Sequence, residues 1–304
     1  MKIILTGGTG LIGSALIEEL VRAKNEIVVT SRAPEKAKTL PRSVKVVKWD
    51  GQTAEGWGVE ADGADAIVNL AGAPIAPLPW TRARKEIIHA SRVNAGQAIV
   101  DAVTRAKNKP RVVVQSSAVG YYGLHGAETL TENSKPGSDY LANVCVDWEN
   151  ATALVEALGV RRAIYRTGLV LARQGGILPR MALPFHLFVG GRVGSGKQWM
   201  SWIHIADEVA AIQFLMANEN ARGVFNLTAP EPVRNQDFAT ALGRALGRPS
   251  AIPVPAFAMK LPLGEMAELL LLGGQRVAPE RLQQMGFQFR FSTLPAALEN
   301  VYHR

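Results

Sequence analysis

Residues 2–13 read KIILTGGTGLIG, and this stretch decides the fold. Ile3–Leu5 is a short apolar run, typical of a strand that is buried on both faces of a sheet. Four glycines follow, at positions 7, 8, 10 and 13, together with apolar residues at helical spacing, Leu11, Ile12, Leu16 and Leu20. The order strand, glycine-rich turn, helix predicts the first unit of an α/β domain.

Three glycines of this turn have separate predicted tasks. Gly7 lets the chain leave the strand tightly, Gly10 lets a pyrophosphate approach the backbone, and Gly13 lets the new helix pack on the strand. The positive end of the helix then faces the anion. Glycine-rich turns also do purely structural work, so the prediction of a dinucleotide site depends on the whole context of strand, turn and helix.

The end of the second expected strand, Glu26–Thr30, predicts which cofactor binds. Ser31 and Arg32 stand where an NAD-specific site usually carries an acidic residue for the ribose 2′-hydroxyl. The planar guanidinium of arginine instead suits a 2′-phosphate, so NADP(H) is favoured over NAD(H). Lys36 and Lys38 either add to the positive field or are solvated charges.

Length and charge set the limits on function. A chain of 304 residues can bury a large core, in one elaborate α/β domain or in two domains. Its formal net charge is +8, but the basic residues are scattered and form no run of five or six. We therefore predict no nucleic-acid partner, and interpret the positive charge as a solubility surplus partly used on an anionic cofactor.

Cysteine content and hydropathy indicate the compartment. Cys145 is the only cysteine, so neither a disulfide within the chain nor a cysteine-based metal site can form, and no metal is expected. The first residues enter a strand directly, which predicts no signal peptide. Glu265 and Glu268 interrupt the apolar segment 261–272, which is too short for a membrane span. We expect a cytoplasmic protein with no membrane partner.

The rest of the chain continues the alternation of strands and helices. The expected strands are Val44–Trp49, Ala66–Ala71, Arg111–Gln115, Arg161–Arg166 and Gly223–Leu227, and the expected helices are Arg82–Thr104, Ala206–Ala217 and Asn235–Gly247. Prolines predict a surface loop over 73–80. This alternation predicts an α/β fold with a doubly wound parallel sheet.

Several motifs resemble one enzyme superfamily. The spacing Gly7-x-x-Gly10-x-x-Gly13 is similar to the TGxxGxxG of extended short-chain dehydrogenases/reductases. Four further segments, 139–149, 166–171, 194–205 and 270–291, resemble an atypical epimerase-family group of that superfamily, which has its own C-terminal tail domain. The resemblance implies an NADP(H)-binding Rossmann domain over 1–168 plus about 200–228. It also implies a smaller mixed lobe for the substrate over 169–199 and 229–304.

The turn, the end of the second strand and the resemblance together predict the cofactor contacts. They are Gly7, Thr9, Gly10, Leu11, Ile12, Gly13, Ser31, Arg32, Leu70, Ala71, Gly72, Arg92 and Ser116.

The superfamily's chemistry uses a serine, a tyrosine and a lysine four residues after the tyrosine. Ser117 follows the C-terminal end of the expected strand 111–115, and Tyr140 stands at the tyrosine position, but Val144 occupies the lysine position. A tyrosine with a pKa near 10 is a poor base at neutral pH. Tyr140 is therefore either a site residue or a packing residue, and Tyr121 either replaces it as a proton donor or forms the pocket wall.

The segment 191–205 contributes the predicted substrate cleft. Residues 191–197 match the phosphate-loop pattern GxxxxGK, but Gln198 replaces the Ser or Thr that binds magnesium and no strand leads into Gly191, so we reject a nucleotide triphosphatase. Lys197, Gln198, Trp202 and His204 are instead expected to line the cleft, with a structural role for His204 as the alternative. Asp207 is expected to cap a helix.

Two functions fit this sequence. The first is an NADP(H)-dependent oxidoreductase, or a nucleotide-sugar-type epimerase or dehydratase, that acts on a small polar molecule. The second is a catalytically weak NADP(H)-binding sensor or partner-binding protein, because Val144 breaks the catalytic set. Either would be a monomer or a homodimer.

Overall fold

A parallel sheet forms the centre of the molecule. A computed structural model describes residues 1–37, 39–76 and 80–303, and within them the main sheet has seven strands in the order β3-β2-β1-β4-β5-β7-β11, every neighbouring pair parallel. The strands are β1 (Lys2–Thr6), β2 (Glu26–Ser31), β3 (Lys45–Lys48), β4 (Ala66–Asn69), β5 (Val112–Ala118), β7 (Arg161–Thr167) and β11 (Gly223–Leu227). The predicted doubly wound sheet is confirmed.

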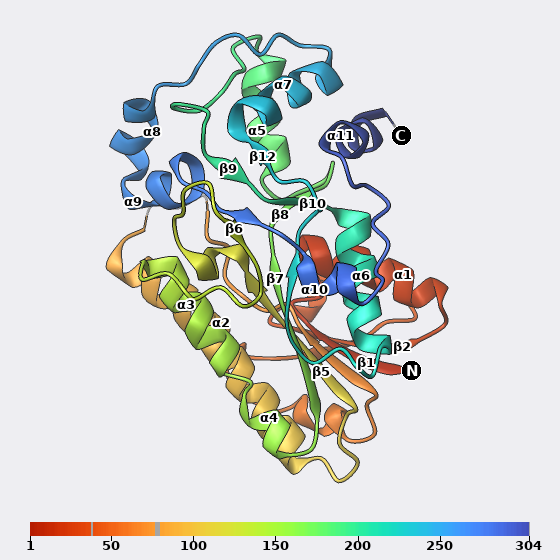
Figure 1. Ribbon diagram of the computed structural model, residues 1–304. Coiled ribbons are helices and arrows are strands. Elements are labelled where there is room, and N and C mark those ends of the chain that lie inside the picture. Colours follow the sequence, from red (N-terminus) through yellow and green to blue (C-terminus); the bar gives the residue numbers. More distant parts are fainter. Residues whose placement is uncertain (38, 77–79, 304) are drawn as a thin grey trace.

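Helices cover both faces of this sheet (Figure 1). One face carries α1 (Leu11–Arg22) and α6 (Ile205–Ala217), and the other carries α2 (Arg82–Arg105), α3 (Tyr140–Asn150) and α4 (Leu154–Ala157). Successive strand residues point to opposite faces: Ile3 and Leu5 join the core under α1, whereas Ile4 joins the core under α2. Burial on both sides explains why the strands are continuous apolar runs.

A smaller lobe lies at one end of the sheet (Figure 1). Its helices are α5 (Leu178–His186), α7 (Asn235–Leu246), α8 (Ala256–Leu263), α9 (Glu265–Ala267) and α11 (Leu294–His303), and its strand pairs are β8 (Leu169–Leu171) with β10 (Trp202–His204) and β9 (Trp199–Met200) with β12 (Val233–Arg234). Phe185, Trp202, Phe238 and Leu298 belong to its separate core. Gly247, with φ +61°, caps α7 in the left-handed region, as its sequence predicts.

The tail of the chain does not stay in this lobe. β13 (Arg276–Val277) pairs with β6 (Thr129–Leu130). The side chains of Leu282, in α10 (Glu280–Gln284), and of Phe287, after that helix, then enter the core between the sheet and α6. The predicted lobe 229–304 therefore needs correction, because part of the tail packs on the sheet domain. Phe291, four residues later, joins the lobe core instead, so the tail links both cores.

Some segments carry only short elements or lie outside the described residues. The short turns are η1 (Pro34–Lys36), η2 (Gly58–Ala61), η3 (Val119–Tyr122) and the π-helical η4 (Glu268–Leu272). Lys38, the side chain of Lys36 and the middle of the predicted loop 73–80 lie outside the described residues. Throughout the described ranges, every helix is too short or too polar to cross a membrane.

Glu208 on α6 predicts a pH dependence of stability. Its side chain is fully buried, and burial raises its pKa from 4.5 to about 8, although Thr167 acts in the opposite direction. The unfolded chain therefore loses this proton near pH 4.5 and the folded chain only near pH 8, so the group's contribution to stability falls across that window. We expect Glu208→Gln to remove this loss, roughly 3–5 kcal/mol at the upper end of the window.

Urea unfolding of the two proteins across that pH window measures the effect. His204 also titrates in the wild type, but it is unchanged in the variant, so the difference between the two curves isolates Glu208. A difference that does not change with pH would contradict the assignment of a raised pKa.

Candidate functional site

A pocket of about 410 Å³ opens where β1, β2 and β4 end. Three loops form most of its wall: the glycine turn with Gly7, Thr9 and Gly10, the end of β2 with Thr30, Ser31 and Arg32, and the loop after β4 with Leu70, Ala71, Gly72 and Ala73. Ligands of open α/β sheets bind at this edge, where the strands' carboxyl ends meet.

The backbone around the glycine turn leaves no room for a side chain at Gly7 or Gly13. Gly7 has φ +71°, and a Cβ there would lie 2.6 Å from the carbonyl oxygen of Leu70. A Cβ at Gly13 would lie 2.7 Å from the carbonyl oxygen of Gly7. α1 begins after Gly10 without a side-chain cap, so its first N–H groups are available to an anion.

Arg32 supplies the positive charge at the other end of this pocket. Its side chain is exposed and passes beside Gly51, and both residues line the pocket. Ser31 accepts a hydrogen bond from the backbone N–H of Ala33, which shapes the turn after β2. A glycine cradle at one end and a guanidinium at the other fit a dinucleotide with a 2′-phosphate.

Five predicted cofactor residues lie outside the pocket wall. Leu11, Ile12 and Gly13 belong to the first turn of α1, and Ser116 is buried in β5. Arg92 is also buried, and burial lowers the pKa of its guanidinium. Arg92 forms part of the wall of a second cavity instead.

This second cavity, of about 470 Å³, lies between the end of the sheet and the lobe. Its wall includes Ser117 of β5, Val144 of α3, Leu169 of β8 and Met181 of α5. Arg92 lies between this cavity and the cofactor pocket. On the side of the cofactor pocket, its guanidinium packs against Gly72 and donates to the carbonyl oxygen of Ala73 at 3.1 Å. On the side of the cavity, it lies 4.8 Å from the centroid of the Trp148 ring. The cavity therefore adjoins the cofactor pocket.

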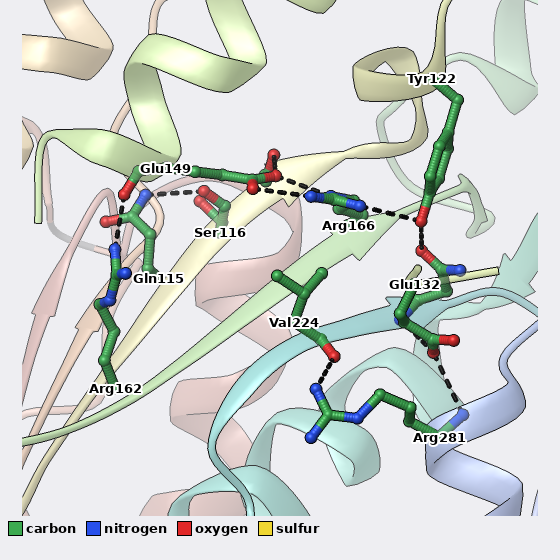
Figure 2. A network of polar contacts seen from close by, with 11 residues as sticks. Gln115, Ser116, Tyr122, Glu132, Glu149, Arg162, Arg166, Val224 and Arg281 are labelled. Carbon is green, nitrogen blue, oxygen red and sulfur yellow. Dashed lines mark hydrogen bonds and ion pairs between the residues drawn. The ribbon is translucent and has the colours of Figure 1, made fainter. Parts of the chain in front are cut away.

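A buried polar network begins at Ser117. The Ser117 hydroxyl donates to Oε1 of Glu149 at 2.7 Å, and Arg166 donates to both oxygens of that carboxylate, at 2.8 and 2.9 Å. Figure 2 shows Glu149 and Arg166 in this pairing, with Tyr122 beyond them. Burial acts to lower the pKa of Arg166, but the hydrogen bonds and charge of Glu149 outweigh it and raise that pKa. Glu149 is thus held as a paired carboxylate next to Ser117.

The network continues toward the tail of the chain. The Tyr122 hydroxyl lies 3.1 Å from Arg166 and donates to Asn226, and burial raises the pKa of Tyr122 to about 12. Glu132 accepts backbone N–H groups from Asn226 and from Arg281 of α10 (Figure 2). This network therefore connects the tail of the chain to Ser117 in the cavity wall.

The predicted tyrosines do not reach the cavity wall. The Tyr140 hydroxyl donates to the carbonyl oxygen of Lys85 at 2.8 Å, its ring packs on Trp80, and burial raises its pKa. The ring of Tyr121 covers the guanidinium of Arg166, 3.2 Å from the ring centroid. Both tyrosine side chains are therefore engaged in contacts within the protein outside this wall, whereas Ser117 and Val144 lie in it.

The four predicted cleft residues lie in different places in the structure. Gln198 lines the cavity and donates to the carbonyl oxygens of Val193 and Leu271, while Lys197 is exposed outside it. Trp202 and His204 need correction, because both are buried in the lobe. Trp202 donates to the carbonyl oxygen of Glu231.

His204 is structural. Its Nδ1 accepts the N–H of Ala206 and so caps α6, and its ring packs on Phe291 at 4.0 Å. Burial, together with Arg290, lowers its pKa to about 4. Asp207 was expected to cap this helix, but it instead accepts the backbone N–H groups of Arg290 and Phe291 and fixes the tail.

Sequence reasoning missed Glu149 and Arg166 as site residues. Both lie in the quoted motif segments, but no spacing rule joins an acid on α3 with an arginine near the end of β7. The position of Arg166, at the end of the predicted strand Arg161–Arg166, was the one available signal.

Comparison with known proteins decides the family. The model of the NAD dependent epimerase/dehydratase family matches residues 3–228, which is most of the chain. The chain belongs to this family. Residues 254–301 match a second model, a domain of unknown function (DUF1731), which corresponds to the tail domain implied by the motifs. The resemblance stated above is confirmed.

Relatives within the epimerase/dehydratase family match over their full length. The chain is 39% identical over 297 residues to epimerase family protein Mb2239 of Mycobacterium bovis, covering 97% of this chain and 96% of that one. It is 38% identical over 301 residues to SH2119 of Staphylococcus haemolyticus, covering 99% and 98%. The crystal structure of human epimerase family protein SDR39U1 with NADPH superposes with a TM-score of 0.91 at 31% identity, covering both chains completely.

Proposed function

We propose that this protein is an NADP(H)-dependent oxidoreductase that acts on a small molecule in the 470 Å³ cavity. One observation carries the proposal: a cavity of ligand size adjoins the cofactor pocket at the carboxyl end of the sheet, and Ser117 lies in its wall. The NADPH in the SDR39U1 structure supports the choice of cofactor.

The cofactor is held by residues of three loops. The uncapped start of α1 and the turn from Gly7 to Gly10 hold the pyrophosphate, and Arg32 holds the 2′-phosphate. Leu70 and Ala71 lie along the same pocket. When bound, NADP(H) supplies or takes up a hydride.

Ser117 and Glu149 move the accompanying proton. The Ser117 hydroxyl already donates to Oε1 of Glu149, so its oxygen is free to accept a hydrogen bond from a substrate hydroxyl. In the oxidative direction the substrate's proton passes to Ser117 Oγ as the serine proton passes to Glu149. Arg166 donates to both oxygens of Glu149 and so holds the carboxylate in place beside Ser117. This pair replaces the tyrosine and lysine, because Val144 cannot assist Tyr140.

Ser117→Ala tests this role. We expect turnover to fall at least ~100-fold, because a relay atom is lost, while the dissociation constant for NADPH changes by less than about twofold. The measurement follows NADPH oxidation with the compound that the wild type reduces fastest among a panel of aldehydes and ketones.

The matched control is Ser195→Ala, which removes an exposed serine outside both pockets and should leave turnover as it is. Unchanged turnover in Ser117→Ala would remove Ser117 from the mechanism.

A second candidate is a cofactor-binding sensor with little chemistry of its own. Val144 at the lysine position and the engagement of the Tyr140 hydroxyl with Lys85 favour it. A protein that binds NADPH tightly, reduces no member of the panel, and gains activity with Val144→Lys would support this candidate over the first.

A further inference from the structure

The wall of the cavity is strongly apolar. Aliphatic side chains enter it from five of the surrounding segments: Ile75 from the loop after β4, Leu141 and Val144 from α3, Leu169 from β8, Met181 from α5, and Leu269–Leu271 from η4. The indole rings of Trp148 and Trp199 add to this surface. The sequence predicts a small polar substrate, but this wall would leave most polar groups of such a molecule without partners.

Polar side chains in the wall are mostly engaged inside the protein. Those that hydrogen-bond to other protein groups are Ser117, Asp139, Thr167, Gln198, Ser201 and Asn235. The Cys145 thiol is also part of the wall, and burial raises its pKa to about 11, so it remains a neutral, apolar group. Besides Ser117 Oγ, the groups left to orient a ligand are the Gln275 amide and the indole N–H groups of Trp148 and Trp199, which have no hydrogen-bond partner among the described residues.

Charge in the wall is equally sparse. Among the described residues that line the cavity, Arg92 and Asp139 are the only charged ones. Arg92 donates to two backbone carbonyl oxygens, those of Ala73 and Ile88, and Asp139 caps α3. Arg234 and Arg276 lie over the ring of Trp199 but do not line the cavity. A diphosphate would bring two negative charges to a wall with one arginine, already engaged.

We propose that the substrate is an apolar carbonyl compound, or the corresponding alcohol, with an aliphatic body that fills the cavity. This inference rests on the proposed function and specifies its substrate class. In reduction, a hydride adds to the carbonyl carbon and a proton from the Ser117–Glu149 pair adds to the oxygen. The products are the alcohol and NADP⁺, and solvent returns the proton to Glu149.

Binding of a homologous series of 2-alkanones tests the substrate class. The protein is saturated with NADP⁺, so that no ketone is reduced, and each ketone from butanone to dodecanone is titrated by calorimetry. UDP-glucose is titrated in the same way. We expect affinity to rise about fourfold per methylene, which corresponds to ~0.8 kcal/mol, until the cavity is filled, and UDP-glucose to bind more weakly than the best ketone.

Two variants of α5 show whether the ketones bind in this cavity. Met181 lines it, whereas Leu183 lies on the same helix, is 58% exposed and does not line it. Met181→Gln should weaken the best ketone about tenfold, because a polar amide replaces apolar wall. Leu183→Gln should leave the affinity as it is. Retained NADP⁺ binding shows that both variants are folded.

The outcomes separate this inference from the proposed function. A protein that binds NADP⁺ but shows no rise in affinity along the series, or prefers UDP-glucose, overturns the substrate class alone. Ketone binding that Met181→Gln does not weaken overturns it as well. A protein that binds the series with the expected increments but does not bind NADP⁺ contradicts the proposed function and leaves the apolar site supported.

Discussion

Arg166→Met is expected to lower the free energy of unfolding by roughly 3–5 kcal/mol. Arg166 and Glu149 are both buried, with side chains only 3% and 8% exposed, and the arginine donates to both carboxylate oxygens. The methionine fills much of the same volume but leaves the buried Glu149 carboxylate without its cationic partner, with only the Ser117 hydroxyl still donating to it. The loss also frees Tyr122, which Arg166 contacts at 3.1 Å.

Chemical denaturation measures this loss, and two further variants control it. Arg22→Met removes an arginine whose pair with Glu19 is exposed on both sides, and it should change stability by less than ~1 kcal/mol. Arg166→Met combined with Glu149→Leu should recover part of the loss, because no unpaired charge remains. If Arg166→Met lowered the free energy of unfolding no more than Arg22→Met does, the pair of Arg166 and Glu149 would not stabilise the fold around the site.

Arg32→Ala is expected to weaken NADPH binding about 10- to 100-fold and to leave NADH binding nearly unchanged. Arg32 lies at the end of β2 in the cofactor pocket, where its guanidinium can donate two hydrogen bonds to a 2′-phosphate. NADH lacks that phosphate, so the substitution removes no contact with it. Equilibrium titration with both cofactors measures the change in selectivity.

Arg22→Ala is the matched control for this change in selectivity. It removes the same charge at the far end of α1, outside the pocket, and should change neither affinity. An equal loss of NADPH and NADH affinity in Arg32→Ala would show that Arg32 shapes the pocket and does not select the phosphate.

Local patterns in the sequence predicted the fold and the cofactor pocket. The apolar run Ile3–Leu5 and the glycines that follow form β1, the turn and α1, because each of these features depends on neighbouring residues. Arg32 could be placed for the same reason, since it directly follows a strand. Most of the cofactor pocket could therefore be predicted without a structure.

The buried polar network that begins at Ser117 could not be predicted in this way. Ser117, Glu149 and Arg166 come from β5, α3 and β7, and contacts between elements 17 to 32 residues apart depend on how helix and sheet pack. Trp202 and His204 alternate with Ile203, as expected of a strand. The parallel pairing of β10 with β8, however, buries them in the lobe. The cavity's apolar character also depends on Leu269–Leu271, distant in sequence.

The melting temperature in the presence of NADPH, compared with NADH at the same concentration, tests the central claim most directly. A ligand at 100 times its dissociation constant stabilises the folded state by about 2.7 kcal/mol. The glycine cradle and Arg32 predict a clear rise with NADPH and a smaller one with NADH. No rise with either cofactor would contradict the account, because the pocket would then bind neither nicotinamide dinucleotide.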